Sequence, residues 1–279
     1  MADVAGFELG GFELLNSAIG GRRARFEIGV PASCPYFEGH FPGNPLLPAV
    51  AQLALVEQLA ARAFGRGNAL LGICAIRFRS PVGPQQRLEV TFELAAQAGV
   101  FELAILRDGA RVCSGELLLG DAGAGLSEIP GNSPRTRSNP PPTAGDYLPH
   151  RAPALFVEEL LEHDELGSLC RARVPPESPF VRAGCFPAYL ALELGAQGAA
   201  ASEAIARRRG EPGAVPRAGY LVGARDARFD RAALSQQESY LVRTRLLRAA
   251  PPLRTWRVEV LLASDPVAVA DVSTFATDA

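Results

Sequence analysis

Alternating polar and apolar side chains mark the first readable element of the chain. Residues 22–30 (RRARFEIGV) alternate in this way, as a half-buried strand does. Residues 48–65 are instead rich in Ala and Leu, start with a proline at a first-turn position and stop at a glycine, which predicts a mostly buried helix. Four strand-like segments separated by Gly, Pro, Asp or Asn turns follow, at 70–79, 87–96, 100–108 and 111–120.

The second half of the chain repeats this order of elements. Without gaps, Pro48 of the first predicted helix falls on Pro187 of the second, an offset of 139 residues (187 − 48). Two copies of one α+β unit are implied, each a long antiparallel sheet wrapped round one central helix. The second copy comprises strands at 153–162 and 168–175, a helix within 186–209, and strands at 218–230, 238–247, 255–263 and 266–276.

A break in composition separates the two copies. Residues 121–144 are rich in Pro, Gly, Ser and Asn and lack apolar periodicity, which is typical of an interdomain linker. The predicted domains are therefore 1–120 and 145–279.

Composition excludes several classes of function. The formal charge is −2, which gives no reason to expect a nucleic-acid or membrane partner. All 28 basic residues are arginine, so Schiff-base, pyridoxal and Walker-A chemistry, each of which needs a lysine, is excluded. The five cysteines form no C-x-x-C pair and the histidines no H-x-x-x-H pair, so we expect no metal site, and we expect buried thiols in a reducing compartment. With no secretory signal pattern, a cytoplasmic location is expected.

The stretch FEGHFPGNPLLPAVAQL, residues 37–53, carries the strongest chemical signal. Its glycines and prolines predict a rigid loop that fixes His40 ahead of a helix. The stretch resembles the active-site signature of the beta-hydroxyacyl-acyl-carrier-protein dehydratases, a hot-dog-fold family whose histidine is followed by a helical acid and, four residues later, by a glutamine. YLPHRAPALFVEEL, residues 147–160, resembles the opening segment of the same family. We expect His150 in that segment to be structural.

The departures from the family pattern are complementary. The acid should lie fourteen residues after the histidine, but residue 54 is alanine, although Gln58 is kept. In the second copy Glu193 and Gln197 match the helical pattern, whereas Pro179 stands at the histidine position. Each half therefore keeps one of the two catalytic residue types and lacks the other.

The resemblance implies a double hot-dog pseudo-dimer in which His40 and Glu193 meet in one composite site, while the mirror-related position is inactive. His40 would act as base, and Glu193, with its pKa raised by desolvation, as acid. The N–H groups of Ala49 and Val50 would polarise the thioester carbonyl at the start of the helix. The substrate-binding residues it implies are Gly43, Leu46, Ala49, Val50 and Gln197.

The resemblance implies dehydration of 3-hydroxyacyl thioesters to trans-2-enoyl thioesters without a cofactor. The pathway would be fatty-acid or polyketide synthesis, and aryl polyene synthesis is one candidate. The expected partner is an acyl carrier protein bearing a 4'-phosphopantetheine-linked acyl chain, and assembly of pseudo-dimers into higher oligomers stays open. Two alternatives also stay open: a hot-dog acyl thioesterase using Glu193 to activate water, and a catalytically silent partner that binds a carrier protein or another dehydratase. The arginines of 77–79 and 225–231 either dock the carrier protein or are solvated strand edges.

Overall fold

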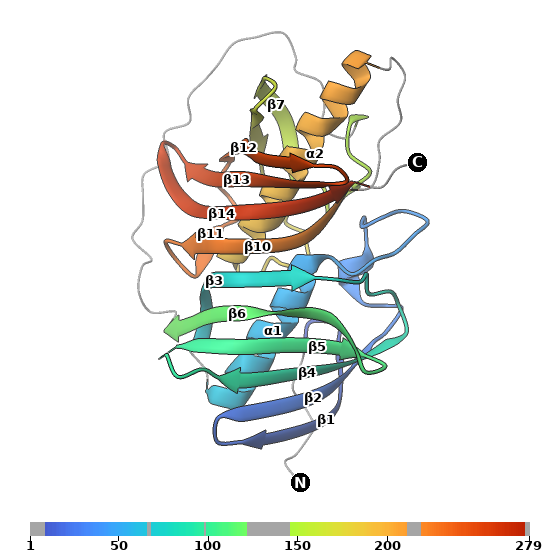
Figure 1. Cartoon of the computed structure of the whole chain (residues 1–279), viewed down its shortest axis with the longest axis vertical. Helices are drawn as coiled ribbons and strands as arrows, with labels where there is room; N and C mark the ends of the chain where they lie inside the picture. The colour runs from blue at the N-terminus through green and yellow to red at the C-terminus, as the bar shows by residue number, and fades with distance from the viewer. Residues whose placement is uncertain (1–8, 66–67, 98, 122–145, 211–218, 277–279) are drawn as a thin grey trace.

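A computed structural model of the chain describes residues 9–65, 68–97, 99–121, 146–210 and 219–276. Except for Asp121, the predicted linker at 121–144 lies outside the described residues. Each half consists of one long helix packed against a curved antiparallel sheet, as the repeat in the sequence predicts (Figure 1).

In the first half the helix α1 spans Ala49–Phe64, with Pro48 at its N-cap and Gly65, at φ +107°, at its end. Glycine is favoured at that position because a positive φ strains side chains that carry a Cβ. The first strand was not predicted, because its residues are mostly exposed and show no alternation. The strands are β1 (Glu13–Gly20), β2 (Arg23–Val30), β3 (Asn68–Phe78), β4 (Gln86–Leu94), β5 (Val100–Arg107) and β6 (Ala110–Asp121), with a 3₁₀ turn η1 (Pro35–Phe37).

In the second half the helix α2 spans Ala191–Gly210, four residues later than the proline that was expected to open it. Pro187 instead closes a short strand and caps the 3₁₀ turn η3 (Ala188–Leu190) that leads into α2. The strands are β7 (Val157–His163), β8 (Gly167–Ala172), β9 (Cys185–Pro187), β10 (Gly219–Phe229), β11 (Ala233–Ser235), β12 (Tyr240–Ala250), β13 (Leu253–Leu262) and β14 (Asp265–Ala276).

The two sheets join edge to edge through β3 and β10, which pair antiparallel with Gly223 opposite Arg77. The result is one twelve-stranded sheet whose order, β1-β2-β4-β5-β6-β3-β10-β14-β13-β12-β8-β7, reads the same way outward from the β3–β10 junction in both halves. Figure 1 shows α1 behind one half of this sheet and α2 behind the other, with their N-terminal ends toward the junction. The predicted α+β double hot-dog is therefore confirmed.

The core is built from the inner faces of both sheets and from the two helices. Cys34, Cys113 and Cys170 are buried there, as expected, but Cys74 is exposed and Cys185 is half-buried, so the expectation of buried thiols is wrong for these two. Within the described ranges no helix has the length and apolar character needed to span a membrane.

Candidate active site

The loop that carries His40 is held by backbone contacts on both of its sides. Gly39 has a φ of +76°, and a Cβ there would overlap the carbonyl oxygen of Arg151 from the second half. The Arg151 N–H donates to the Gly39 carbonyl at 3.1 Å, and the Leu46 N–H donates to the His40 carbonyl at 3.0 Å. Glycine is thus required where the His40 loop meets the backbone of the second half at Arg151.

The His40 ring has a defined orientation. Its Nδ1 lies 2.9 Å from the carbonyl oxygen of Leu46, and a carbonyl can only accept a hydrogen bond. In the neutral ring Nδ1 therefore carries the hydrogen, and Nε2 keeps its lone pair. His40 as a residue is 8% exposed, and its ring stacks on Phe41 with 4.2 Å between the centroids.

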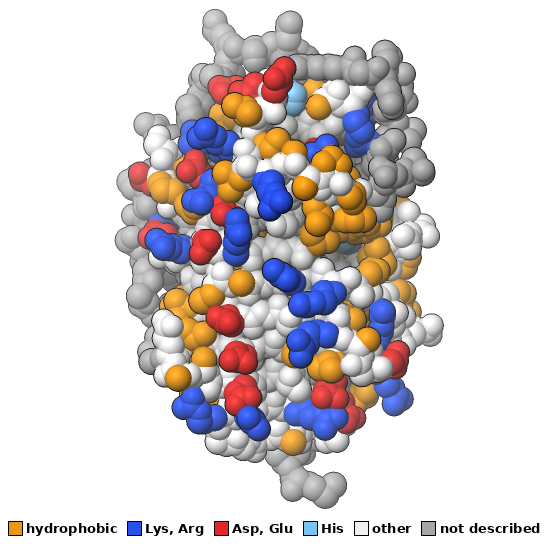
Figure 2. Space-filling view, viewed as in Figure 1, with side chains coloured by type: hydrophobic (Ala, Val, Ile, Leu, Met, Phe, Trp, Pro, Cys, Tyr) orange, Lys and Arg blue, Asp and Glu red, His pale blue; other side chains and the backbone are white. Residues whose placement is uncertain are grey.

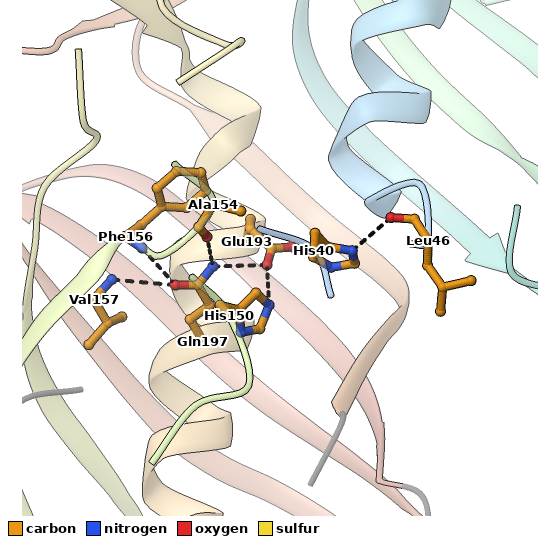
Figure 3. Close-up of polar contacts among 8 residues, drawn as sticks. All are labelled: His40, Leu46, His150, Ala154, Phe156, Val157, Glu193 and Gln197. Carbon is orange, nitrogen blue, oxygen red and sulfur yellow. Dashed lines mark hydrogen bonds and ion pairs between the residues drawn. The ribbon is translucent and has the colours of Figure 1, made fainter. Parts of the chain in front are cut away.

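Glu193 projects from the first turn of α2 and is 5% exposed. Gln197, one helical turn later, donates from Nε2 to Glu193 Oε1 at 3.1 Å and to the carbonyl oxygen of Ala154 at 2.8 Å. Its Oε1 accepts from the N–H of Phe156 at 2.9 Å and of Val157 at 3.4 Å (Figure 3). Gln197 thus fixes the carboxyl and ties α2 to the segment that enters β7.

His150 was expected to be structural, but it lies in the site. Its Nε2 is 3.4 Å from Glu193 Oε1, and its ring centroid is 5.3 Å from that of His40. One ring nitrogen of each histidine and one oxygen of Glu193 all lie within 4.8 Å of one another (Figure 3). Sequence reasoning did not place His150 beside Glu193, because the two are 43 residues apart (193 − 150) and no local spacing relates them.

The three side chains face one cavity of about 340 Å³. One wall is a face of α2 that presents Ala196, Ala200 and Glu203 beyond Glu193. Leu46 and Ala49 of the first half line it as well, so the cavity is shared between the two halves. Other parts of its wall come from residues 78–81 of the first half and from 219–222 and 274–276 of the second.

The pKa values of His40 and Glu193 are both lowered, but by different causes. Burial lowers the pKa of the His40 imidazole and outweighs the opposing effect of the nearby Glu193 carboxylate, which favours the neutral, basic ring. Burial alone would raise the pKa of Glu193, but the hydrogen bond and charge of His150, the charge of His40 and the Gln197 hydrogen bond together lower it. The expectation of a raised pKa for Glu193 is therefore wrong, because the sequence did not reveal that His150 lies beside it in addition to His40.

The remaining predicted residues have different surroundings. Val50 is fully buried in the first turn of α1, and Gly43, at φ +80°, has open space where a Cβ would stand. In α1 the Ala51 and Gln52 N–H groups already donate to Pro48, and the N–H groups of Ala49 and Val50 precede them, where helices leave donors without intrahelical partners. That Gly43, Leu46, Ala49, Val50 and Gln197 contact substrate stays a prediction, as does the absence of a metal.

Two family profiles match the chain in tandem. The ApeI-like profile (ApeI dehydratase) covers residues 16–116, and the ApeP-like profile (ApeP dehydratase) covers residues 142–279. The 3-hydroxyacyl-[acyl-carrier-protein] dehydratase FabZ of Caldicellulosiruptor bescii is 36% identical over 108 residues, which are 35% of this chain and 77% of that protein. The chain belongs to the hot-dog dehydratase family. It is a fused tandem pair of its domains.

Other members of the family give the same picture. FabZ of Myxococcus xanthus is 39% identical over 97 residues, 30% of this chain, and the match spans 63% of that protein's own length. Among solved structures, the dehydratase domain of PpsC from Mycobacterium tuberculosis superposes with a TM-score of 0.64 at 12% identity, covering 95% of this chain and 98% of that one. This likeness concerns the fold, and it extends over both halves.

Proposed function

We propose that the protein dehydrates 3-hydroxyacyl thioesters carried by an acyl carrier protein to trans-2-enoyl thioesters, with one composite active site per chain. The observation that carries the proposal is the approach of His40, from the first half, to Glu193, from the second, with both facing one cavity. The tandem ApeI-like and ApeP-like domains favour a polyketide-type pathway such as aryl polyene synthesis over housekeeping fatty-acid synthesis.

The chemistry follows from the orientation of the groups. His40 Nε2 takes the α-proton of the substrate, and the N–H groups of Ala49 and Val50 stabilise the enolate character that develops on the thioester oxygen. The bond from the β-carbon to its oxygen then breaks while the hydroxyl takes a proton from the Glu193 side of the site, and water departs. The proton left on His40 returns to the acid side after product release.

An arginine-rich surface beside the cavity suits an acidic carrier protein. Arg79 is exposed and lines the cavity, and Arg77 and Arg111 are exposed on the same groove of the sheet. Figure 2 shows basic side chains gathered near the middle of this face, apart from a column of acidic ones. Arginine pairs well with carboxylates and phosphates, so we include docking at Arg77, Arg79 and Arg111 in the proposal.

The central test is a turnover assay with a 3-hydroxyacyl thioester on a carrier protein, followed by mass for the loss of one water. We expect His40→Ala and Glu193→Gln each to lower kcat/KM by about 10² to 10⁴, which is the usual contribution of a positioned acid or base. Gln58→Ala, at the position of α1 that corresponds to Gln197, is the matched control and should keep near-normal turnover.

The same assay separates the alternatives. A thioesterase would release free thiol without forming an enoyl product, and a silent partner would show no turnover in any variant. Wild-type turnover in Glu193→Gln would contradict the composite site, since the second half would then serve only as a scaffold.

A further inference from the structure

His150 is more deeply buried than either predicted catalytic group, with 4% of its side chain exposed. It belongs to the segment that precedes β7, and the neighbouring Arg151 binds the Gly39 carbonyl of the first half. Its ring and that of Phe41 pack in a T-shaped arrangement with their centroids 4.8 Å apart. Both halves of the chain therefore fix the position of His150.

The hydrogen bonding of this ring points to more than packing. Nε2 faces Glu193 Oε1 at 3.4 Å, while Nδ1 is buried and has no hydrogen-bond partner within the described part of the chain. A buried polar atom without a partner costs free energy that an apolar side chain of similar shape would avoid. An imidazole at this position therefore needs another reason, and its contact with Glu193 supplies one.

Several charged or titratable groups surround the His150 ring. Glu193 faces it from α2 and His40 from the first half, and the Arg151 guanidinium donates to the backbone carbonyl of His150 at 2.7 Å. Along the same cavity lie Arg79, Glu203, Arg207 and Tyr220. Because the two imidazoles and Gln197 all favour an ionised Glu193, this carboxyl alone is poorly suited to keep a proton near neutral pH.

We infer that His150 is a positioning residue that shares with Glu193 the proton taken by the departing hydroxyl, so that the acid is a pair and not a single carboxyl. The inference rests on the proposed dehydration. In the step itself, Glu193 Oε passes the shared proton to the hydroxyl as the carbon–oxygen bond breaks. His40 then holds the α-proton, and its transfer to the pair restores the starting state.

The test is the pH profile of kcat/KM for wild type, His150→Gln and His150→Phe. Glutamine keeps an N–H donor for Glu193 but cannot hold an additional proton, whereas phenylalanine keeps only the aromatic shape. A carboxylic acid ordinarily loses its proton near pH 4.3, about two units below an imidazole. In His150→Gln the alkaline limb, where kcat/KM falls with rising pH, should therefore move to lower pH. At a pH where wild type is still fully active, kcat/KM should fall about tenfold for each pH unit by which the limb moves.

A merely structural role predicts something different. Either a wild-type shape of the profile in His150→Gln, or an equal loss at every pH in both variants, would overturn the inference. Circular dichroism and thermal melting confirm that each variant is folded. If wild type dehydrates no 3-hydroxyacyl thioester, the proposed function fails, and that outcome is distinct from a normal profile in the variants.

A readout independent of turnover uses ¹⁵N nuclear magnetic resonance of the histidine rings. The chain has only three histidines, so single variants assign every ring. We expect Glu193→Gln to change the ¹⁵N shifts of His150, because the carboxyl that shares its proton is lost, while the shifts of His163 stay as in wild type. Unchanged shifts of His150 would show that the ring and the carboxyl share no proton.

Discussion

The two halves of the chain carry different residues at the positions that correspond to the predicted catalytic pair. On one side His40 and Glu193 approach each other beside a cavity. At the corresponding positions, 139 residues away in each case, stand Pro179 and Ala54. The side chains of Tyr36, Gln58 and Arg182 converge on Gly10, so the backbone of the N-terminal segment occupies the space near Gln58. Both helices are kept, but only the first of these two pairs of positions holds an imidazole and a carboxyl.

Gln197 and Gln58 stand at corresponding positions of α2 and α1, and their hydrogen bonds differ. Gln197 holds the buried carboxyl and three backbone groups between Ala154 and Val157, where the chain enters β7. Gln58 turns back to the carbonyl of Ala54 in its own helix at 3.0 Å, and its Oε1 has no partner within the described residues. The glutamine therefore makes an extended hydrogen-bond network only in the half where an acid and an entering backbone segment are there to be bound.

Restoring the acid at the mirror position should have the largest effect on stability. Ala54 is 5% exposed, and Ala54→Glu would bury a carboxyl next to Gln58, whose Nε2 already donates to the Ala54 carbonyl. We expect a loss of about 3 to 5 kcal/mol, comparable to an uncompensated buried charge, without any gain of dehydration in a His40→Ala background. Urea unfolding at pH 7 measures the loss, and a variant of near-normal stability would show that the mirror position can still hold an acid.

The glutamines should differ by a smaller amount. Gln197→Ala leaves buried N–H and C=O groups without partners, which costs about 1 to 3 kcal/mol, and it also releases Glu193, so kcat/KM should fall. Gln58→Ala removes one bond within a helix and should cost less than about 1 kcal/mol with unchanged turnover. Urea unfolding and the turnover assay on both variants provide the comparison. Equal costs would mean that the network around Gln197 has no special weight.

Much of this architecture could be predicted from periodicity. The alternation at 22–30 and the Pro-opened, Gly-closed helix at 48–65 correspond to β2 and α1 within one residue, because local burial and capping decide these elements. The pairing of β3 with β10 could come only from the resemblance to a dimeric family, since nothing in either strand specifies its partner across the chain.

Only the site residues that belong to a sequence motif could be predicted. His40 and Glu193 stand out because a loop pattern and a helical register identify them. His150 does not, because its relation to Glu193 arises from folding of the segment before β7 against α2. The predicted direction of the pKa shift of Glu193 was wrong for the same reason: its burial and the nearby His40 were foreseen, but the hydrogen bond and charge of His150 were not.

The smallest expected effect concerns the acid limb of the pH profile of kcat/KM, where His40 of the site is compared with Glu57 outside it. Burial lowers the pKa of His40, so the ring is neutral, and able to act as base, down to a pH below the ordinary value of about 6.5. Activity should therefore rise with pH through a limb centred below 6.5. Glu57 of α1, whose pKa burial raises, accepts from the Leu70 N–H at 3.0 Å and lies outside the site cavity as described. Glu57→Gln removes that titration and should leave the limb in place; a limb that moves in Glu57→Gln, or one centred above 6.5, would mean that His40 is not the group whose deprotonation starts the reaction.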